Sequence, residues 1–449
     1  MSILNVNKIN PVGGGSTITI AGIASVTSSV TAPSFVGAVT GNGTGNVTGN
    51  SDTASGLSGN PSINTTGIVT ATSFVPTVGQ LSHRNIIING DMRIAQRATS
   101  STSSGIHSVD RFGVWYDNVD EAPTQERYVM NSGDTGPWES GFRNALKVTN
   151  GNQTSGAGAD DYIWIQNLIE AQDIANSGWH YTDSSSFITL SFWVKSSAAQ
   201  NFYGYLLTLD GTMQRYAFET GALTAFTWKK VVLKIPGNSN ITIDDNNGEG
   251  FRIEWRPFSG TDETDSGVSL NTWGAFAGGT RTPDSPTTWY TTNDASFQIT
   301  GVQLELGDTA TPFEHRSYGE ELLRCKRYYQ RSTDSSRGTD YTLSTGTWHS
   351  ADGSQSFSKH NSYYDWKQNF EVEMRVAPTL TIYGSSNQGD IHLESIAVGS
   401  KQVDWNNNTT EVKTKGFLLR HIEDQSSGNY TSGSGNAFGI LAYTVDAEL

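Results

Sequence analysis

Side chains that could perform catalysis are present, but their spacing matches no catalytic motif. A carboxylate pair such as Asp160 and Asp161 could supply the acid and base of an enzyme that degrades surface polysaccharide. Such pairs are common in an acidic chain, so this one does not favour hydrolysis. The sequence lacks the Gly-x-Ser-x-Gly elbow, the His-Glu-x-x-His zinc motif and a Gly-rich phosphate loop ending in Lys. We therefore expect a protein that is not an enzyme, with no catalytic residues and no cofactor.

Two short acidic segments could bind an ion or form a special turn. Residues 244–250, DDNNGEG, offer oxygen ligands for Ca²⁺ from Asp244, Asp245, Asn246 and Glu249. They lack the alternate acidic spacing and the distant Glu of an EF-hand loop, so we interpret them as a strand-joining turn. Residues 132–138, SGDTGPW, fall one residue short of the Asp-box turn of sialidase-like folds, and that turn is structural. The sequence therefore predicts no metal site.

Aromatic residues beside polar ones are the remaining candidates for ligand binding. The segment NSYYDWKQ brings together Tyr363, Tyr364 and Trp366, and Trp193 points away from the apolar face of its predicted strand. Flat rings can cover the C–H faces of a sugar while amides and carboxylates bind its hydroxyls. These four residues are our candidate ligand-binding residues. In the alternative interpretation Trp193 packs at a subunit interface, which we favour for it, and the Tyr/Trp cluster caps one end of a sandwich.

The chain is long enough for two or three structural units and is strongly acidic. Its 449 residues exceed the size at which one core stops growing. A net charge of −15 argues against binding to nucleic acid or to an anionic membrane surface. No basic-then-apolar leader and no run of 18 apolar residues occur, so we expect synthesis in the cytoplasm and no membrane insertion. With Cys325 as the single cysteine, an intrachain disulfide is excluded.

Residues 1–80 differ in composition from the rest of the chain. They contain no Trp or Tyr, and residues 40–51, TGNGTGNVTGNS, repeat the triplet Thr-Gly-Asn. The flanking segments 29–37 and 68–76 share the pattern VTAxSFV. Such a region is either a flexible linker or a fibrous shaft whose short strands pack against identical chains. We favour the shaft, because repeats that cannot bury their own apolar residues need neighbours.

Residues 81–314 carry the alternation of half-buried strands. In residues 187–196 the apolar set is Ile188, Leu190, Phe192 and Val194, and residues 251–256 alternate in the same way. In residues 296–307 the apolar phase shifts by one beside Gly301, which predicts a β-bulge. One apolar face per strand predicts an antiparallel jelly roll or β-sandwich.

Residues 315–332 are predicted to form an amphipathic connecting helix. Tyr318, Leu322, Cys325 and Tyr329 fall on one stripe, so Cys325 is expected to pack as a small apolar side chain. Residues 333–449 supply further strands, including a run that keeps one parity across Pro378 and so places that proline at an edge or bend. The fold class is therefore mainly β, with a C-terminal β-sandwich as its last domain.

Several blocks of the sequence resemble tail-fibre and receptor-binding proteins of tailed bacteriophages, particularly fibres of phages that infect cyanobacteria and other marine bacteria. The resemblance lies in SILNVNKINPVGGGSTITI, in the shaft text TGNVTGNSDTASGLSGNPSINTTGIVTATSF, and in NIIINGDMRIAQR followed by VDRF. It continues in SFWVKSS, ITGVQLELGDTATPFEHRSYGEELLRCKRYYQ, MRVAPTLTIYG and AYTVDAEL. These blocks span nearly the whole chain, and residues 299–330 are the most specific.

The resemblance implies an elongated homotrimeric fibre in the tail of a virion. Residues 1–80 would attach to the phage tail or baseplate, residues 81–314 would form a carbohydrate-binding jelly roll, and residues 333–449 would form the distal tip. The distal domains would then bind host surface polysaccharide. The alternative is a purely structural fibre or baseplate spike that binds another virion protein. The family supplies no fixed ligand motif, so no binding residue is carried over from it.

Overall fold

The structure is a computed structural model. It describes residues 83–332, 356–360, 363–383, 390–395, 399–404, 409–422 and 442–449. The predicted shaft, residues 1–80, lies outside the described residues, and the trimer stays a prediction. The described chain is mainly β, as predicted, and none of its helices is long and apolar enough to cross a membrane.

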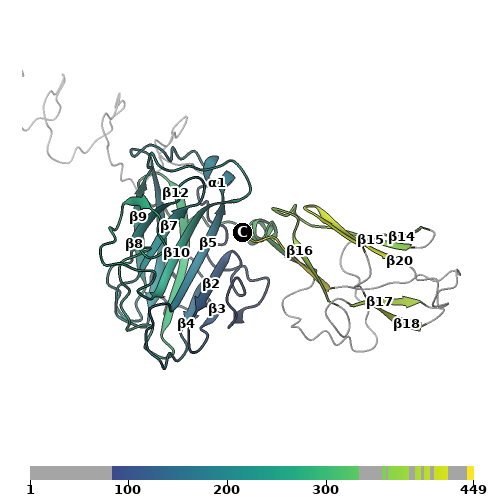
Figure 1. The fold of residues 1–449 in the computed structure, drawn as a ribbon, viewed down its shortest axis with the longest axis horizontal. Coiled ribbons are helices and arrows are strands. Elements are labelled where there is room, and N and C mark those ends of the chain that lie inside the picture. The colour runs from purple at the N-terminus through teal and green to yellow at the C-terminus, as the bar shows by residue number, and fades with distance from the viewer. Residues whose placement is uncertain are drawn as a thin grey trace, which may run out of the picture. The chain divides into compact units, whose positions relative to one another are not determined.

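Two six-stranded antiparallel sheets form the main domain, and we call them sheet A and sheet B (Figure 1). Sheet A runs in the order β1 (Ser100–Ser101), β3 (Thr124–Val129), β4 (Asn144–Thr149), β12 (Ser296–Leu306), β6 (Phe187–Ser196) and β9 (Lys229–Pro236). Sheet B runs in the order β11 (Trp273–Ala275), β8 (Gln214–Glu219), β7 (Tyr203–Thr208), β10 (Glu249–Ser259), β5 (Tyr162–Glu170) and β2 (Phe112–Asp117). This arrangement agrees with the predicted β-sandwich.

The core lies between the two sheets and follows the predicted alternation. The inward side chains of β6 have 0% exposure: Ile188, Leu190, Phe192 and Val194. They join one cluster with inward residues of sheet B, including Phe251, Ile253 and Trp255 of β10. The predicted bulge is confirmed, because the register of β12 against β6 shifts between Thr300 and Gln303. Gly301 sits at the shift with φ +63°, and a β-carbon there would lie 2.6 Å from the ring of Phe142.

The expectation of one buried face per strand is wrong for β10. Glu254 and Arg256 point away from the core, yet each is only 1% exposed. The segment 260–285 covers the outer face of the neighbouring strands, where Val268 and Phe276 pack against Tyr205. The covering segment follows β10 directly but leaves no pattern within β10 itself, so the alternation of the strand alone could not indicate it.

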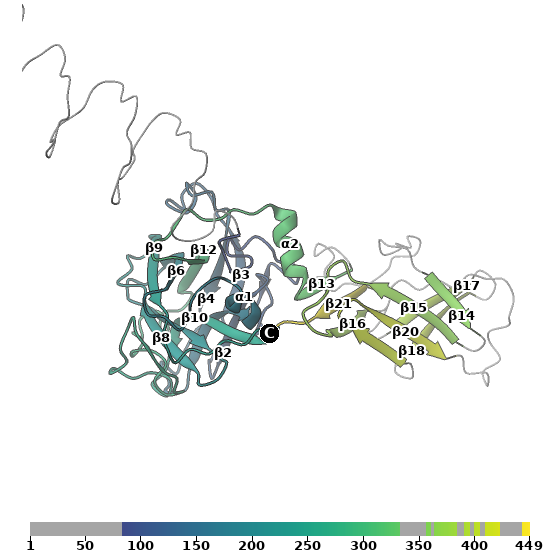
Figure 2. The same cartoon turned by 90° about the horizontal axis from the view of Figure 1, so that it is seen from above.

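The predicted helix 315–332 is shorter in the structure. Helix α2 spans Tyr318–Lys326, its N-cap Ser317 accepts a hydrogen bond from Glu320 N, and the chain then enters β13 (Tyr329–Arg331; Figure 2). Tyr318 is 58% exposed and does not belong to the buried stripe. Glu321 is buried there instead, because Arg316 and the amide of Asn89 bind its carboxylate. Cys325 is buried as expected.

The other short helix and the described C-terminal strands complete the fold. Helix α1 spans Ala171–Ala175 directly after β5. The C-terminal sheets contain β14 (Ser356–His360), β15 (Tyr363–Asn369), β16 (Thr379–Tyr383), β17 (Asp390–Ser395), β18 (Gly399–Asp404), β19 (Thr409–Lys413), β20 (Gly416–Ile422) and β21 (Ala442–Asp446). Pro378 immediately precedes β16, which pairs with β21 alone among the described strands. This position fits the predicted edge or bend.

A buried carboxylate connects the end of β5 to the chain after α2. Glu170 has 0% exposure, and it accepts hydrogen bonds from Arg327 Nε at 2.7 Å and from the hydroxyl of Tyr328 at 2.6 Å. Burial raises the pKa of Glu170, but the hydrogen bonds from Arg327 and Tyr328 outweigh it and hold the pKa below its ordinary value. The guanidinium of Arg111 lies 3.4 Å from the Tyr328 ring and also pairs with Glu448. The end of the chain is thus fixed to the main domain by ionic contacts.

We predict that Glu170→Gln lowers the free energy of unfolding by about 2 kcal/mol at neutral pH, because it weakens charged hydrogen bonds inside the protein. The pKa of Glu170 is depressed in the folded state. The stability difference between the parent and Glu170→Gln is therefore largest above the ordinary pKa of 4.5 and becomes smaller as the pH falls below it. Urea unfolding followed by tryptophan fluorescence measures this.

The matched control for that measurement is Glu126→Gln. Glu126 pairs with Lys147 at 2.8 Å on the surface, so its replacement should change stability by less than about 1 kcal/mol. Equal losses in the two variants, or a difference between parent and Glu170→Gln that does not vary with pH, would contradict the assigned role of Glu170.

Candidate functional site

Three aromatic residues form a partly exposed surface on the outer face of sheet B, and we call it the aromatic surface: Trp115, Tyr162 and Trp164. The rings of Tyr162 and Trp164 stack with centroids 4.0 Å apart and planes 19° from parallel. Trp115 of β2 is the direct cross-strand partner of Trp164 of β5 and is 38% exposed. The surface therefore presents flat apolar rings to solvent at one edge of the sheet.

The alternation of β5 and β2 places these rings. Ile163 and Ile165 of β5 have 0% exposure in the core, so Tyr162 and Trp164 must face outward. In β2 a β-carbon at Gly113 would lie 2.7 Å from Trp115 Nε1. Glycine at that position lets the indole lie close against its own strand.

A buried group of charges lies beside the aromatic surface. The guanidinium carbon of Arg256 lies 4.6 Å from the Trp164 ring, and its Nη2 donates to Glu263 at 2.6 Å. Arg281 pairs with the other oxygen of Glu263 at 2.5 Å. Burial raises the pKa of Glu263, and the two arginines only partly oppose this. The arrangement supports the rings from below through cation–π contact.

Some polar atoms of this region have no hydrogen-bond partner within the described part of the chain. They are Trp164 Nε1, Arg256 Nη1 and Glu254 Oε2, and all three are buried. Unpaired buried polar atoms are rare in native proteins and often occur where solvent or a ligand completes the hydrogen bonding. Exposed stacked rings with polar side chains nearby are typical of sugar-binding surfaces.

The structure places Trp193 in a different region, on the outer side of sheet A. A β-carbon at Gly136 would lie 2.8 Å from its ring and one at Gly301 3.1 Å, and the ring packs with Phe142 and Trp228. These contacts within one chain give Trp193 a packing role. Its role in ligand binding is not tested by the structure and stays a prediction.

The segment SGDTGPW forms turns beside this cluster. The carboxylate of Asp134 accepts hydrogen bonds from Lys195 Nζ at 2.6 Å and from Trp228 Nε1 at 2.9 Å. Burial raises the pKa of Asp134, and these donors lower it below its ordinary value. The segment therefore has the structural role that its sequence suggested.

The predicted Tyr/Trp cluster lies in β15, between β14 and β20. Tyr363 is the register partner of His360 and Ile422, and Trp366 is the partner of Phe357 and Leu419. The strand also contains Tyr364. The ligand-binding role of these residues stays a prediction.

None of the three members of the aromatic surface is among the ligand-binding residues predicted from the sequence. The run Tyr162-Ile163-Trp164-Ile165 did contain a signal, because two aromatic residues alternate with two isoleucines. Either set could have faced the core, since both are apolar. The partner Trp115 could not be inferred at all, because the pairing of β2 with β5 joins residues about fifty positions apart.

Residues 244–248 of the acidic segment form the turn that leads into β10, and this turn is hydrogen-bonded to the start of α1. The carbonyls of Asn246 and Gly248 accept hydrogen bonds from the amides of Gln172 and Ala171. Within the described ranges, no group of three or more His, Cys, Asp or Glu side chains could hold a metal ion. Burial raises the pKa of the Cys325 thiol well above its ordinary value, so this thiol is a poor nucleophile.

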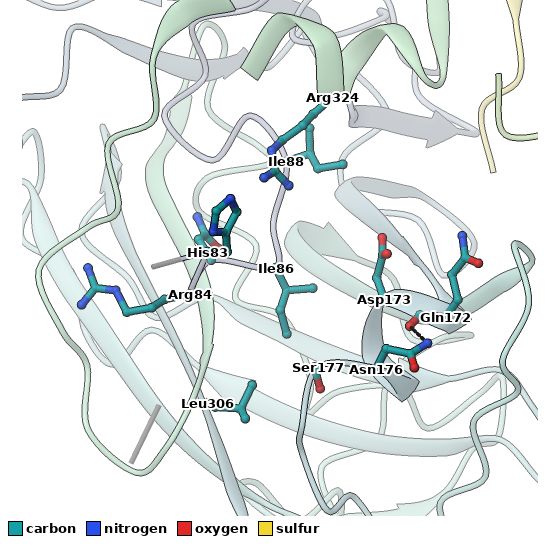
Figure 3. Close-up of a pocket in the computed structure, with 11 residues that line it drawn as sticks. His83, Arg84, Ile86, Ile88, Gln172, Asp173, Asn176, Ser177, Leu306 and Arg324 are labelled. Atoms are coloured by element: carbon teal, nitrogen blue, oxygen red, sulfur yellow. Dashed lines mark hydrogen bonds between the residues drawn. The ribbon is translucent and has the colours of Figure 1, made fainter. Parts of the chain in front are cut away.

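A pocket of about 350 Å³ lies elsewhere on the main domain (Figure 3). Residues 83–86 and Ile88 form one side, α1 and the two residues after it form another, and Leu306 and Arg324 complete the lining. No candidate residue from the sequence analysis lines it. Its chemistry differs from that of the aromatic surface, because no Trp, Tyr or Phe is among its lining residues.

Comparisons with protein-family models and with curated proteins found no match. Among solved structures the chain is similar to the enzymatically active domain of tailspike protein 4 of bacteriophage CBA120, with 11% identity and a TM-score of 0.25. That match covers 50% of this chain and 21% of the tailspike structure, so the chain matches about a fifth of its length.

Two further solved structures contain carbohydrate-binding modules. One is the N-terminal cellulose-binding domain of β-1,4-glucanase C from Cellulomonas fimi, with 8% identity, a TM-score of 0.23, and coverage of 49% of this chain and 99% of that one. The other is the CBM22-1–CBM22-2 tandem domain of Xyn10C from Paenibacillus barcinonensis, with 10% identity, a TM-score of 0.24, and coverage of 83% and 92%. At these TM-scores the similarities assign neither a family nor a ligand to this chain.

We predict that Arg256→Met lowers the free energy of unfolding by about 3 kcal/mol. The substitution removes the cation that pairs with the buried carboxylates of Glu254 and Glu263. Lys234→Met is the control, since Lys234 pairs with Asp308 in solvent and should contribute less than about 1 kcal/mol. Urea unfolding of the two variants and the parent makes the comparison. Parent-like stability of Arg256→Met would show that the charges do not support the rings.

Proposed function

We propose that the chain is a non-enzymatic adhesin that binds glycan through its aromatic surface. The observation that carries the proposal is the exposed Trp115 beside the stacked pair of Tyr162 and Trp164. Rings held in this way can cover the C–H faces of successive sugar units, and the partly exposed side chains of Glu263 and Arg281 can bind hydroxyls. The rings occupy fixed positions on strands, so little side-chain freedom would be lost on binding.

We further propose that this binding attaches a phage virion to the surface of its host. The support is the sequence resemblance to tail fibres, together with an acidic charge that opposes nonspecific binding to nucleic acid. In this proposal residues 1–80 join three chains into a shaft and attach it to the tail or baseplate. Three copies of a weak site on one fibre would raise the effective affinity through multivalency. The tip residues Tyr363, Tyr364 and Trp366 would add contacts in the C-terminal domain.

The proposal is tested by binding of the full chain to an array of bacterial surface polysaccharides. We expect Trp115→Ala and Trp164→Ala each to weaken binding about tenfold or more, which corresponds to the loss of about 1.4 kcal/mol of stacking. Because Trp115 is more exposed than Trp164, its variant carries the smaller risk of unfolding.

The control variant is Phe226→Ala. Phe226 is 73% exposed and lies outside the aromatic surface, so its removal should leave glycan binding unchanged. If the parent binds polysaccharide and both tryptophan variants bind it equally well, the aromatic surface is not the site. Release of new reducing ends from the polysaccharide would overturn the non-enzymatic part of the proposal.

A further inference from the structure

The pocket in Figure 3 has the size of a small-molecule site and an unusual distribution of hydrogen-bonding groups. Its volume of about 350 Å³ lies within the range of ligand pockets in proteins. Ile86, Ile88 and Leu306 give it an apolar part. The polar side chains of α1 and its C-terminal end face the same space.

Most side-chain donors on the α1 side are already used within the protein. Gln172 Nε2 donates to Glu170 at 2.5 Å, and Asn176 Nδ2 donates to Asp245 at 2.8 Å and to the carbonyl of Gln172 at 2.9 Å. The hydroxyl of Ser177 donates to the carbonyl of Ile174 at 2.7 Å. What this side mainly offers to a ligand is therefore a set of acceptors, the amide oxygens of Gln172 and Asn176 and the carboxylate of Asp173, beside one N–H of Gln172.

Asp173 is the charged member of this set. Its carboxylate has no hydrogen-bond donor and no cation within ion-pair distance among the described residues. Burial and the neighbouring Glu170 raise the pKa of Asp173, and the charges of Arg327, Arg111 and Arg324 only partly oppose them. A cationic ligand group that reached Asp173 would thus supply the close partner that the protein does not provide.

The cations that line the same pocket are directed elsewhere. Arg324 is bound by Glu320 at 3.1 Å, and His83 lies 3.9 Å from the same carboxylate. Arg84 donates to the carbonyl of Pro312 at 3.1 Å and lies across the pocket from Asp173 in Figure 3. The α1 side therefore favours a ligand group that is cationic and rich in donors.

We propose that this pocket is a second binding site, which takes an amino sugar with a free, protonated amine. The ammonium group donates to Asp173, and ligand hydroxyls donate to the amide oxygens of Gln172 and Asn176. The C–H face of the sugar packs on Ile86 and Leu306. The negative net charge of the chain favours the approach of such a cation.

The test is a titration of the full chain with three monosaccharides, followed by calorimetry or by ligand-observed NMR. D-Glucosamine is the cationic probe, and D-glucose and N-acetyl-D-glucosamine are its uncharged counterparts. At about pH 6 the amine is protonated, as expected for an aliphatic amine of this kind. We expect glucosamine to bind at least about tenfold more tightly than either uncharged sugar, because a charged hydrogen bond contributes about 1.4 kcal/mol or more.

The variant Asp173→Asn keeps the size of the side chain and removes its charge. It should reduce the affinity for glucosamine about tenfold, to the level of glucose. Asp262→Asn is the matched control, because Asp262 is exposed and does not line the pocket, and it should bind glucosamine like the parent. Equal affinity of the parent for glucosamine and glucose, or an unchanged affinity in Asp173→Asn, would overturn the proposal. The titration does not use polysaccharide, so its failure is distinct from a failure of the aromatic surface.

Discussion

The burial of apolar side chains between the two sheets is the constraint on which the rest of the structure depends, and β5 shows it most directly. Ile163 and Ile165 are completely buried in the core. Each contributes about 1.5–3 kcal/mol through burial, so a register shift that exposed both would cost several kcal/mol. Because side chains alternate along a strand, Tyr162 and Trp164 must then lie on the outer face of the sheet.

The same strand also positions the features at its end. Glu170 is the buried last residue of β5 and accepts hydrogen bonds from Arg327 and Tyr328. Helix α1 begins at the next residue. Helix α1 then brings Asp173 to the pocket. The aromatic surface and the pocket are thus two consequences of one buried strand, although they offer a ligand different chemistry.

The sequence predicted the parts of the fold that depend on neighbours along the chain. The inward parity of β6, the bulge at Gly301 and the burial of Cys325 all follow from local spacing. It failed where residues outside the element itself decide the environment. Helix α2 ends early because Tyr329 pairs with β21, and Arg256 is buried because segment 260–285 supplies Glu263. The candidate site failed for the same reason, since Trp115 meets Trp164 only through long-range pairing.

The central claim is that the outer edge of sheet B binds sugar through its rings. The most direct measurement is a structure of the full chain with an oligosaccharide cut from a polysaccharide that it binds. We predict a sugar ring lying parallel to Trp115 or to the pair of Tyr162 and Trp164, with its hydroxyls toward the neighbouring charged groups. An oligosaccharide bound elsewhere, with these three rings still open to solvent, would contradict the account.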